Sequence, residues 1–168
     1  MSSAMTPIVL IFATLFSGLL AGGNIDRAFV AMPAWQQVGA IAWSEFSRHA
    51  DLGNGLIVYP VEAIAGALLT AAAAVGSYFD RGVPRPAALC LYAAALFAAG
   101  GLMFTVKAAP IMLGLRDGSD PAALQQAFEG FWFWGNLRAV CQVLTFFAQL
   151  LALAALLRNR GWPSSGPT

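Results

Sequence analysis

Residues 139–157 read AVCQVLTFFAQLLALAALL and contain no charged side chain. Two further stretches, from Met1 to Ile25 and from Pro86 to Val106, also lack Asp, Glu, Lys and Arg, and Leu56 to Phe79 contains only Glu62. A helix needs about 20 mostly apolar residues to cross roughly 30 Å of hydrocarbon. We therefore predict one transmembrane domain with four spans, at about residues 7–27, 56–79, 87–107 and 131–157.

The composition of the whole chain points to the same class. Hydrophobic residues make up 59% of the 168 residues and charged residues only 10%, whereas about a quarter of a soluble domain is charged. Strands are not expected, because apolar and polar residues do not alternate. The net charge of +1 gives no basic surface for nucleic acid. The expected fold is an all-α, integral membrane four-helix transmembrane bundle, with the lipid bilayer as its partner.

The placement of arginine predicts the orientation. The first span lacks a basic leader and is longer than a usual signal-peptide core, so we expect it to be retained. Four spans put both termini on one side, together with the short link between the second and third spans. Counted over the loops, Lys and Arg are nearly tied, but four arginines lie in short segments beside the termini: Arg81, Arg85, Arg158 and Arg160. The prediction is a multi-pass protein of the inner (plasma) membrane with both termini in the cytoplasm and a flexible tail, 161–168.

Both outer loops contain signals for short helices. Pro33 suits the first turn of a helix, and apolar residues follow it at helical spacing: Trp35, Val38, Ala42 and Phe46. This pattern predicts a short helix that lies in the membrane interface. In the second loop, Asp120-Pro121 is typical of a helix start. A second short helix is therefore expected before the last span, which begins in the aromatic cluster 131–134 at headgroup depth.

Glu62 is the clearest ionisable residue at membrane depth. It shares one helical face with Asn54 and Val58, and Tyr59 is a neighbour. Charged groups inside a span are costly and usually face a bundle interior or a water-filled cavity. A single polar contact between helices would explain Glu62 without any function. A functional carboxylate is the favoured interpretation, because an amide could serve for packing alone.

The last span has a longer polar face. Arg138, Gln142, Thr145 and Gln149 recur at helical spacing and are expected to point inward. Helix-to-helix hydrogen bonds account for the glutamines, but a guanidinium stays charged and requires a partner. Glu62 is the predicted counter-ion of Arg138. The alternative is that Arg138 reaches the outer headgroups.

Three other polar residues approach the same outer region. Asn24 does so from the first span and Lys107 from the third. His49 is the only histidine in the chain and follows the first interfacial helix. It is either a solvated loop residue or a proton carrier.

The small numbers of histidine and cysteine residues restrict the kinds of metal and thiol site that the chain can form. One histidine excludes two-histidine iron sites and multi-histidine zinc or copper sites within one chain, while a single-histidine haem stays open. The two cysteines, Cys90 and Cys141, lie at different depths and are not expected to form a disulfide. No metal site or cofactor is predicted. The candidate functions that remain are proton-transfer chemistry and ligand binding without catalysis.

The proton-transfer chemistry would combine a base, an anion site and aromatic walls. Glu62 or His49 would be the general base in an apolar pocket. Arg138 and Lys107 would stabilise an enolate or phenolate, with Trp132 and Trp134 beside a flat hydrophobic substrate. Such a carbanion reacts with oxygen without a cofactor. The predicted catalytic residues are Glu62, Arg138 and His49, and the predicted ligand-binding residues are Asn136, Trp134, Trp132, Tyr59, Asn54, Lys107 and Asn24.

Three motifs resemble one family. They are the Gly-rich end of the first span, Ser17-Gly18-Leu19-Leu20-Ala21-Gly22, its continuation Ala31-Met32-Pro33-Ala34, and Trp134-Gly135-Asn136-Leu137-Arg138 at the start of the last span. Together they resemble the anthrone oxygenase-like family of small membrane proteins. The resemblance implies a four-helix membrane bundle and, as in the few characterised relatives, cofactor-independent oxygenation of a polyketide anthrone to a quinone. The positions that the resemblance implies for the site are Asn136, Arg138 and Trp134.

Three functions therefore stay open. The first is an enzyme, a cofactor-independent monooxygenase that binds a lipophilic aromatic, polyketide-like or quinone-like molecule in the outer half of the bundle. The second is an accessory or pigment- or quinone-binding subunit of a larger membrane complex. The third is a small transporter or proton path, which would require a homo-oligomer, because four helices rarely suffice for alternating access.

Overall fold

The computed structural model describes residues 5–159, and all regular structure in that range is helical. Four long helices are apolar enough to cross a membrane: α1 (Met5–Asp26), α4 (Gly55–Phe79), α5 (Arg85–Leu113) and α6 (Pro121–Asn159). The predicted all-α four-helix transmembrane bundle is confirmed. The predicted flexible tail, 161–168, lies outside the described residues.

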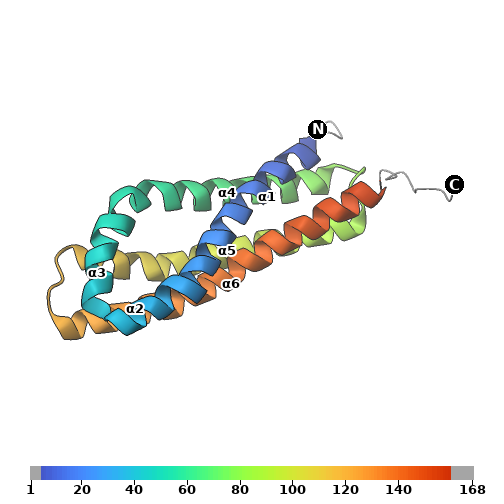
Figure 1. Cartoon of the computed structure of the whole chain (residues 1–168). Coiled ribbons are helices and arrows are strands. Elements are labelled where there is room, and N and C mark those ends of the chain that lie inside the picture. The colour runs from blue at the N-terminus through green and yellow to red at the C-terminus, as the bar shows by residue number, and fades with distance from the viewer. Residues whose placement is uncertain (1–4, 160–168) are drawn as a thin grey trace.

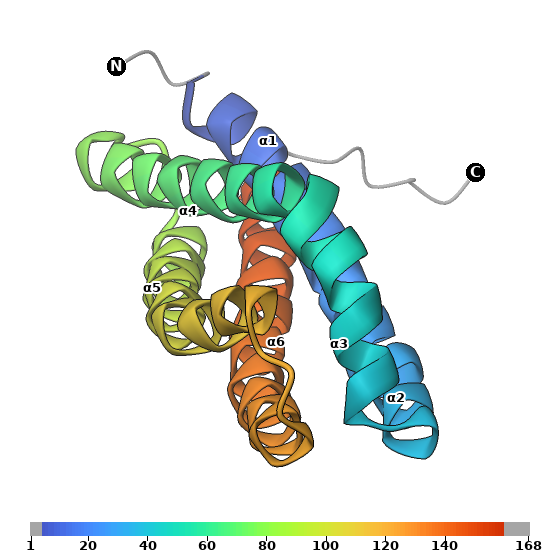
Figure 2. The same ribbon diagram turned by 90° about the vertical axis from the view of Figure 1, so that its left-hand side faces the viewer.

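The long helices meet at one end and diverge at the other (Figures 1 and 2). The start of α1, the end of α6 and the link between α4 and α5 lie at the same end. The opposite end, which we call the outer end, carries five short elements: η1 (Arg27–Ala31), α2 (Met32–Val38), α3 (Ala40–His49), η2 (Ala50–Asn54) and η3 (Gly114–Arg116). There α4 stands apart from α5 and α6, and the side chains from Leu56 to Val61 are all exposed.

Burial is arranged as expected for a protein in lipid. Large apolar side chains such as Leu96, Met103 and Leu151 are exposed on the outside of the bundle. Polar side chains are buried between the helices, among them Thr70 and Gln149. In a hydrocarbon solvent, polar groups must find partners inside the protein. The multi-pass membrane assignment therefore has support from side-chain placement as well as from helix length.

Two apolar clusters hold the bundle together. The inner cluster consists largely of alanine with a few leucines, and its small side chains let the helices approach closely, as in other membrane bundles. The outer cluster contains larger side chains, with Trp43 of α3 packed on Phe128 and Phe131 of α6. These aromatic contacts attach the short outer helices to the bundle.

The first outer loop differs from its prediction. Pro33 does lie in the first turn of a helix, but that helix ends at Val38 and a second one begins at Ala40. Gly39 separates them, with φ +95° and ψ 161°. After this break α3 crosses the end of the bundle (Figure 1). The predicted apolar face, which runs through Ala42 and Phe46, is exposed, and α3 packs on the bundle through its other face: Ala40, Trp43, Ser44 and Ser47.

Replacing Gly39 with alanine is expected to cost about 1–3 kcal/mol of stability, because this backbone conformation is nearly restricted to glycine. Unfolding in mixed SDS micelles would measure the loss. Gly22→Ala is the control, since a Cβ at Gly22 meets no atom within 4 Å and alanine is the better helix former. Equal stability of the two variants would contradict this geometry of the loop.

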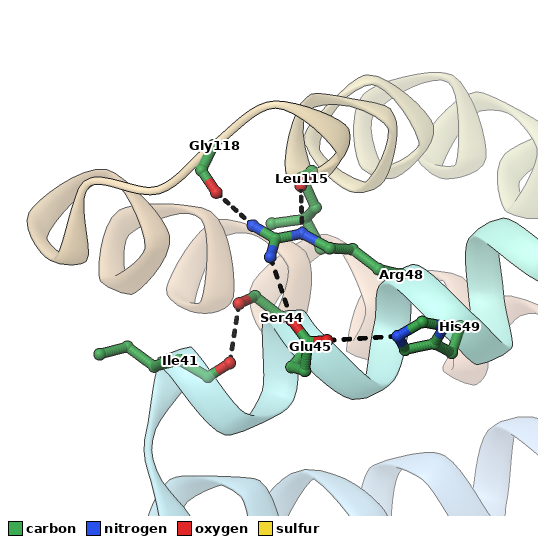
Figure 3. Close-up of polar contacts among 7 residues, drawn as sticks. All are labelled: Ile41, Ser44, Glu45, Arg48, His49, Leu115 and Gly118. Carbon is green, nitrogen blue, oxygen red and sulfur yellow. Dashed lines mark hydrogen bonds and ion pairs between the residues drawn. The ribbon is translucent and has the colours of Figure 1, made fainter.

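The second outer loop also differs from its prediction. The helix start is confirmed, since Asp120 accepts a hydrogen bond from the backbone N–H of Ala123 at 2.9 Å. However, α6 continues without a break to Asn159, so the helix that begins at Pro121 and the last span are one helix. Arg48 of α3 fixes the loop (Figure 3): its Nε donates to the carbonyl of Leu115 at 2.7 Å, and an Nη donates to the carbonyl of Gly118.

Candidate functional site

A buried ion pair lies at the outer end of the bundle. Arg27, the first residue of η1, donates a hydrogen bond to the carboxylate of Asp51 in η2. The same guanidinium donates to the Tyr59 hydroxyl of α4 at 3.3 Å. The Asp51 side chain is only 6% exposed. The pair therefore connects the end of α1 to the start of α4 across the first outer loop.

Arg138 of α6 shares an aromatic ring with this ion pair. Its Cζ lies 5.9 Å from the centroid of the Phe131 ring, and the Cζ of Arg27 lies 5.6 Å from the same centroid. Arg138 forms no ion pair within residues 5–159, and its Nε is sealed from solvent without a hydrogen-bond partner. A ring face attracts a cation by about 0.5–2 kcal/mol. This attraction is much weaker than a carboxylate contact.

The prediction that Glu62 is the counter-ion of Arg138 is wrong. Glu62 is half-buried, one helical turn beyond Tyr59 on α4, and no ion pair joins it to Arg138. The carboxylate that the structure brings to this region is that of Asp51, which pairs with Arg27. The physical reason is the position of α4: its first turns stand away from α6, while the loop before it folds inward and brings Asp51 to the site.

Asn24 of α1 is buried and borders the same small cavity as Arg27. Its amide donates to the side-chain oxygen of Gln142 and to the carbonyl of Leu20 at 2.6 Å. Beneath this contact is a cavity of about 20 Å³ that reaches Ser17 of α1, Gly66 of α4 and Thr145 of α6. A cavity of this size holds about one water molecule.

The predicted polar face of α6 does point inward. Gln142, Thr145 and Gln149 are all buried. Gln149 donates to the Thr70 hydroxyl at 2.7 Å, and its own Oε1 is buried without a partner. Further toward the ends of the chain, the bundle interior is occupied by the inner apolar cluster. Polar side chains are buried at the inner end as well, where Thr6 donates a hydrogen bond to the Asp80 carboxylate at 3.3 Å.

Three predicted ligand-binding residues lie in the outer part of α6. Asn136 and Trp132 line a second cavity, of about 10 Å³, which Asn24 and Arg27 also border. Trp134 stacks on Phe104 of α5, with the ring centroids 6.2 Å apart. The structure thus brings Asn24 and Asn136 to one cavity, while Trp134 packs against the neighbouring helix.

Other predicted site residues lie apart from Arg138. The His49 side chain is 80% exposed and is bonded to Glu45 of its own helix at 3.2 Å (Figure 3). Lys107 on α5 and Asn54 in η2 are exposed. None of the three has a hydrogen bond or ion pair with the Arg27–Asp51 pair in the part of the chain that the structure describes. Tyr59 alone of the α4 residues contacts that pair, through its hydroxyl.

Metal and thiol chemistry have no assembled site within the described range. No three His, Cys, Asp or Glu side chains gather there in a group that would hold a metal ion. Cys90 and Cys141 are free thiols. What the outer end does assemble is a set of charged and amide side chains: two guanidiniums, one carboxylate, a phenol hydroxyl and two amides. This set can hold an anion and orient it by hydrogen bonds.

No known protein family, curated protein or solved structure matches this chain. The chemistry of the outer end therefore has to be argued from its own residues. Sequence reasoning missed the Arg27–Asp51 pair, although one signal for it was present: both residues flank the first outer loop, at the ends of apolar spans, where an isolated charge needs a partner.

Proposed function

We propose that the protein binds a lipophilic molecule in the outer half of its bundle, between α1, α4 and α6. The observation that carries the proposal is the position of Arg138 beside Phe131, at the depth of a membrane span: the side chain is half-buried, its Nε is sealed from solvent, and it has no hydrogen bond within the described residues. Ionisable groups at that depth are costly and usually mark a binding or transport site. The apolar surroundings and the aromatic residues at the start of α6 suit a flat hydrophobic body.

The site must change shape to admit such a molecule. The present cavities, of about 20 and 10 Å³, are smaller than any ring system. The start of α4 is the element able to move, because Pro60 within the helix lacks a backbone N–H to donate. Gly53, just before α4, has a non-helical backbone. Binding would then proceed from the bilayer, past the exposed first turns of α4.

The proposed reaction is cofactor-independent oxygenation, which the resemblance to the anthrone oxygenase-like family supports. Glu62 removes a proton from the anthrone methylene, and Arg138 stabilises the resulting phenolate. Molecular oxygen then oxidises that carbon to a carbonyl: one oxygen atom enters the product and the other leaves as water. Glu62 is half-buried on α4 and directly precedes Ala63, which lines the larger cavity.

Orientation and location belong to the same proposal. Both termini face the cytoplasm of the inner (plasma) membrane, since arginines flank the inner ends of the spans. The binding site then lies in the outer leaflet half. A reporter enzyme fused to the end of the chain would test the orientation.

Oxygen uptake by the purified protein with anthrone tests the reaction. Glu62→Gln is expected to lower the rate by about 100-fold or more, the usual contribution of a general base. Glu129→Gln is the matched control, because Glu129 is exposed and bonds only to Gln125 of its own helix. Unchanged uptake in Glu62→Gln would exclude Glu62 as the base. No uptake by the unaltered protein would exclude this reaction.

A further inference from the structure

We infer that the ligand of this site is a lipophilic monoanion, whose carboxylate or phenolate binds the guanidinium of Arg138. This inference rests on the binding site proposed above and specifies the charge of its ligand. It starts from the charges at the outer end. Arg27 and Arg138 flank one ring, that of Phe131, and Asp51 is the only carboxylate paired with either guanidinium among the described residues.

Asp51 is committed to Arg27. Their contact is a direct ion pair, and Tyr59 occupies a second donor of the same guanidinium. Arg138 has no hydrogen bond at all within residues 5–159, and its Nε is sealed from solvent. The two guanidiniums beside Phe131 therefore carry one more positive charge than their ion pair with Asp51 neutralises.

A guanidinium keeps its positive charge, because it does not lose its proton in proteins. Burying an unpaired charge costs several kcal/mol, and partners of the opposite charge normally accompany it. Gln142, one turn further along α6, offers no help, because its oxygen accepts from Asn24. Arg138 is half-buried, with its Nε sealed from solvent, and an anion from outside the chain would neutralise it.

The surroundings restrict that anion further. One uncompensated positive charge calls for one negative charge, since a dianion such as phosphate would leave a new charge unpaired. The planar fork of donors on a guanidinium fits a carboxylate well. Next to it lies the Phe131 ring, and one turn further along α6 Gln142 borders the larger cavity, whose apolar lining includes Leu20 and Leu102. The ligand is thus an amphiphile with an acidic head and an apolar body.

Matched fluorescent probes test this inference with the full-length protein in detergent. We expect 9-anthracenecarboxylate to bind about 10- to 100-fold more tightly than 9-anthracenecarboxamide, the range set by hydrogen bonds to charged groups. Arg138→Gln should remove this preference, and Arg138→Lys should restore part of it. Arg116→Gln is the control, since Arg116 is an exposed arginine at the same end of the bundle. It should leave the preference intact.

The outcomes separate the inference from the proposed function. Equal binding of the acid and the amide would overturn the anion and leave the lipophilic site in place. Binding of neither probe would overturn the site itself. Oleate also separates two sources of the acid: displacement of the aromatic probe supports a fatty acid, and no displacement supports an aromatic acid.

A stability measurement keeps the test independent of folding failure. Without ligand, Arg138→Gln should melt at the same temperature as the unaltered protein or higher, because it removes an unpaired buried charge. With the aromatic acid added, only the unaltered protein should gain thermal stability, by the linkage of binding to folding. A large loss of stability in the ligand-free variant would show that Arg138 already has a partner, and would overturn the inference.

Discussion

Replacing Asp51 with asparagine is expected to lower the free energy of unfolding by about 3 kcal/mol, the cost of breaking a buried ion pair from one side. Asp51 is 6% exposed and is the carboxylate between the ends of α1 and α4. Without it, Arg27 and Arg138 face the same Phe131 ring as two unpaired cations. Equilibrium unfolding in mixed micelles measures the loss.

A second substitution makes the physical cause testable. Arg138→Gln, introduced together with Asp51→Asn, removes one of the two cations and should recover about 1 kcal/mol or more, as expected for groups in one charge network. Asp117→Asn, which alters an exposed acid at the same end, should change stability by less than about 0.5 kcal/mol. A loss in Asp51→Asn no larger than that of this control would contradict the buried pair.

Truncating Trp43 to alanine is expected to cost about 3–5 kcal/mol, the usual range for a large aromatic residue in a core. Trp43 is 2% exposed. Its ring lies 5.2 Å from that of Phe128 and 5.8 Å from that of Phe131, measured between centroids. The indole therefore attaches α3 to α6 and supports Phe131, the ring that both guanidiniums share. Ligand affinity should fall together with stability.

Phe46 supplies the comparison for Trp43. It belongs to the predicted apolar face of the same helix, but it is 50% exposed and contacts Trp35 rather than the bundle. Phe46→Ala should cost less than half as much as Trp43→Ala in a detergent unfolding series. Equal losses would mean that α3 packs through the face that the sequence pattern favours.

The four spans and their inward polar face were predictable because they depend on local quantities. A run such as 139–157 is apolar for the length of a membrane crossing. The spacing of Gln142, Thr145 and Gln149 places them on one side of any α-helix, and lipid on the outside requires that side to face inward. Neither argument needs to know where another helix lies.

The predictions that were wrong depended on where other segments of the chain lie. Glu62 was expected to pair with Arg138 because both residues lie in the outer half of their spans, yet depth alone does not fix the distance between two helices. The first loop was expected to form one helix, because its spacing is helical on both sides of Gly39. A glycine without a structural context predicts neither a break nor a positive φ.

By itself, then, the sequence determined the membrane class, the number of spans and the residues that face the interior. Hydrocarbon thickness and helical periodicity act on each segment separately, so they can be read from it. The tertiary structure decided the pairing of charges: Arg27 with Asp51, and Arg138 with no residue of the described chain. Ion pairs depend on distances of a few ångströms between segments far apart in the chain, and the fold of the first outer loop sets those distances.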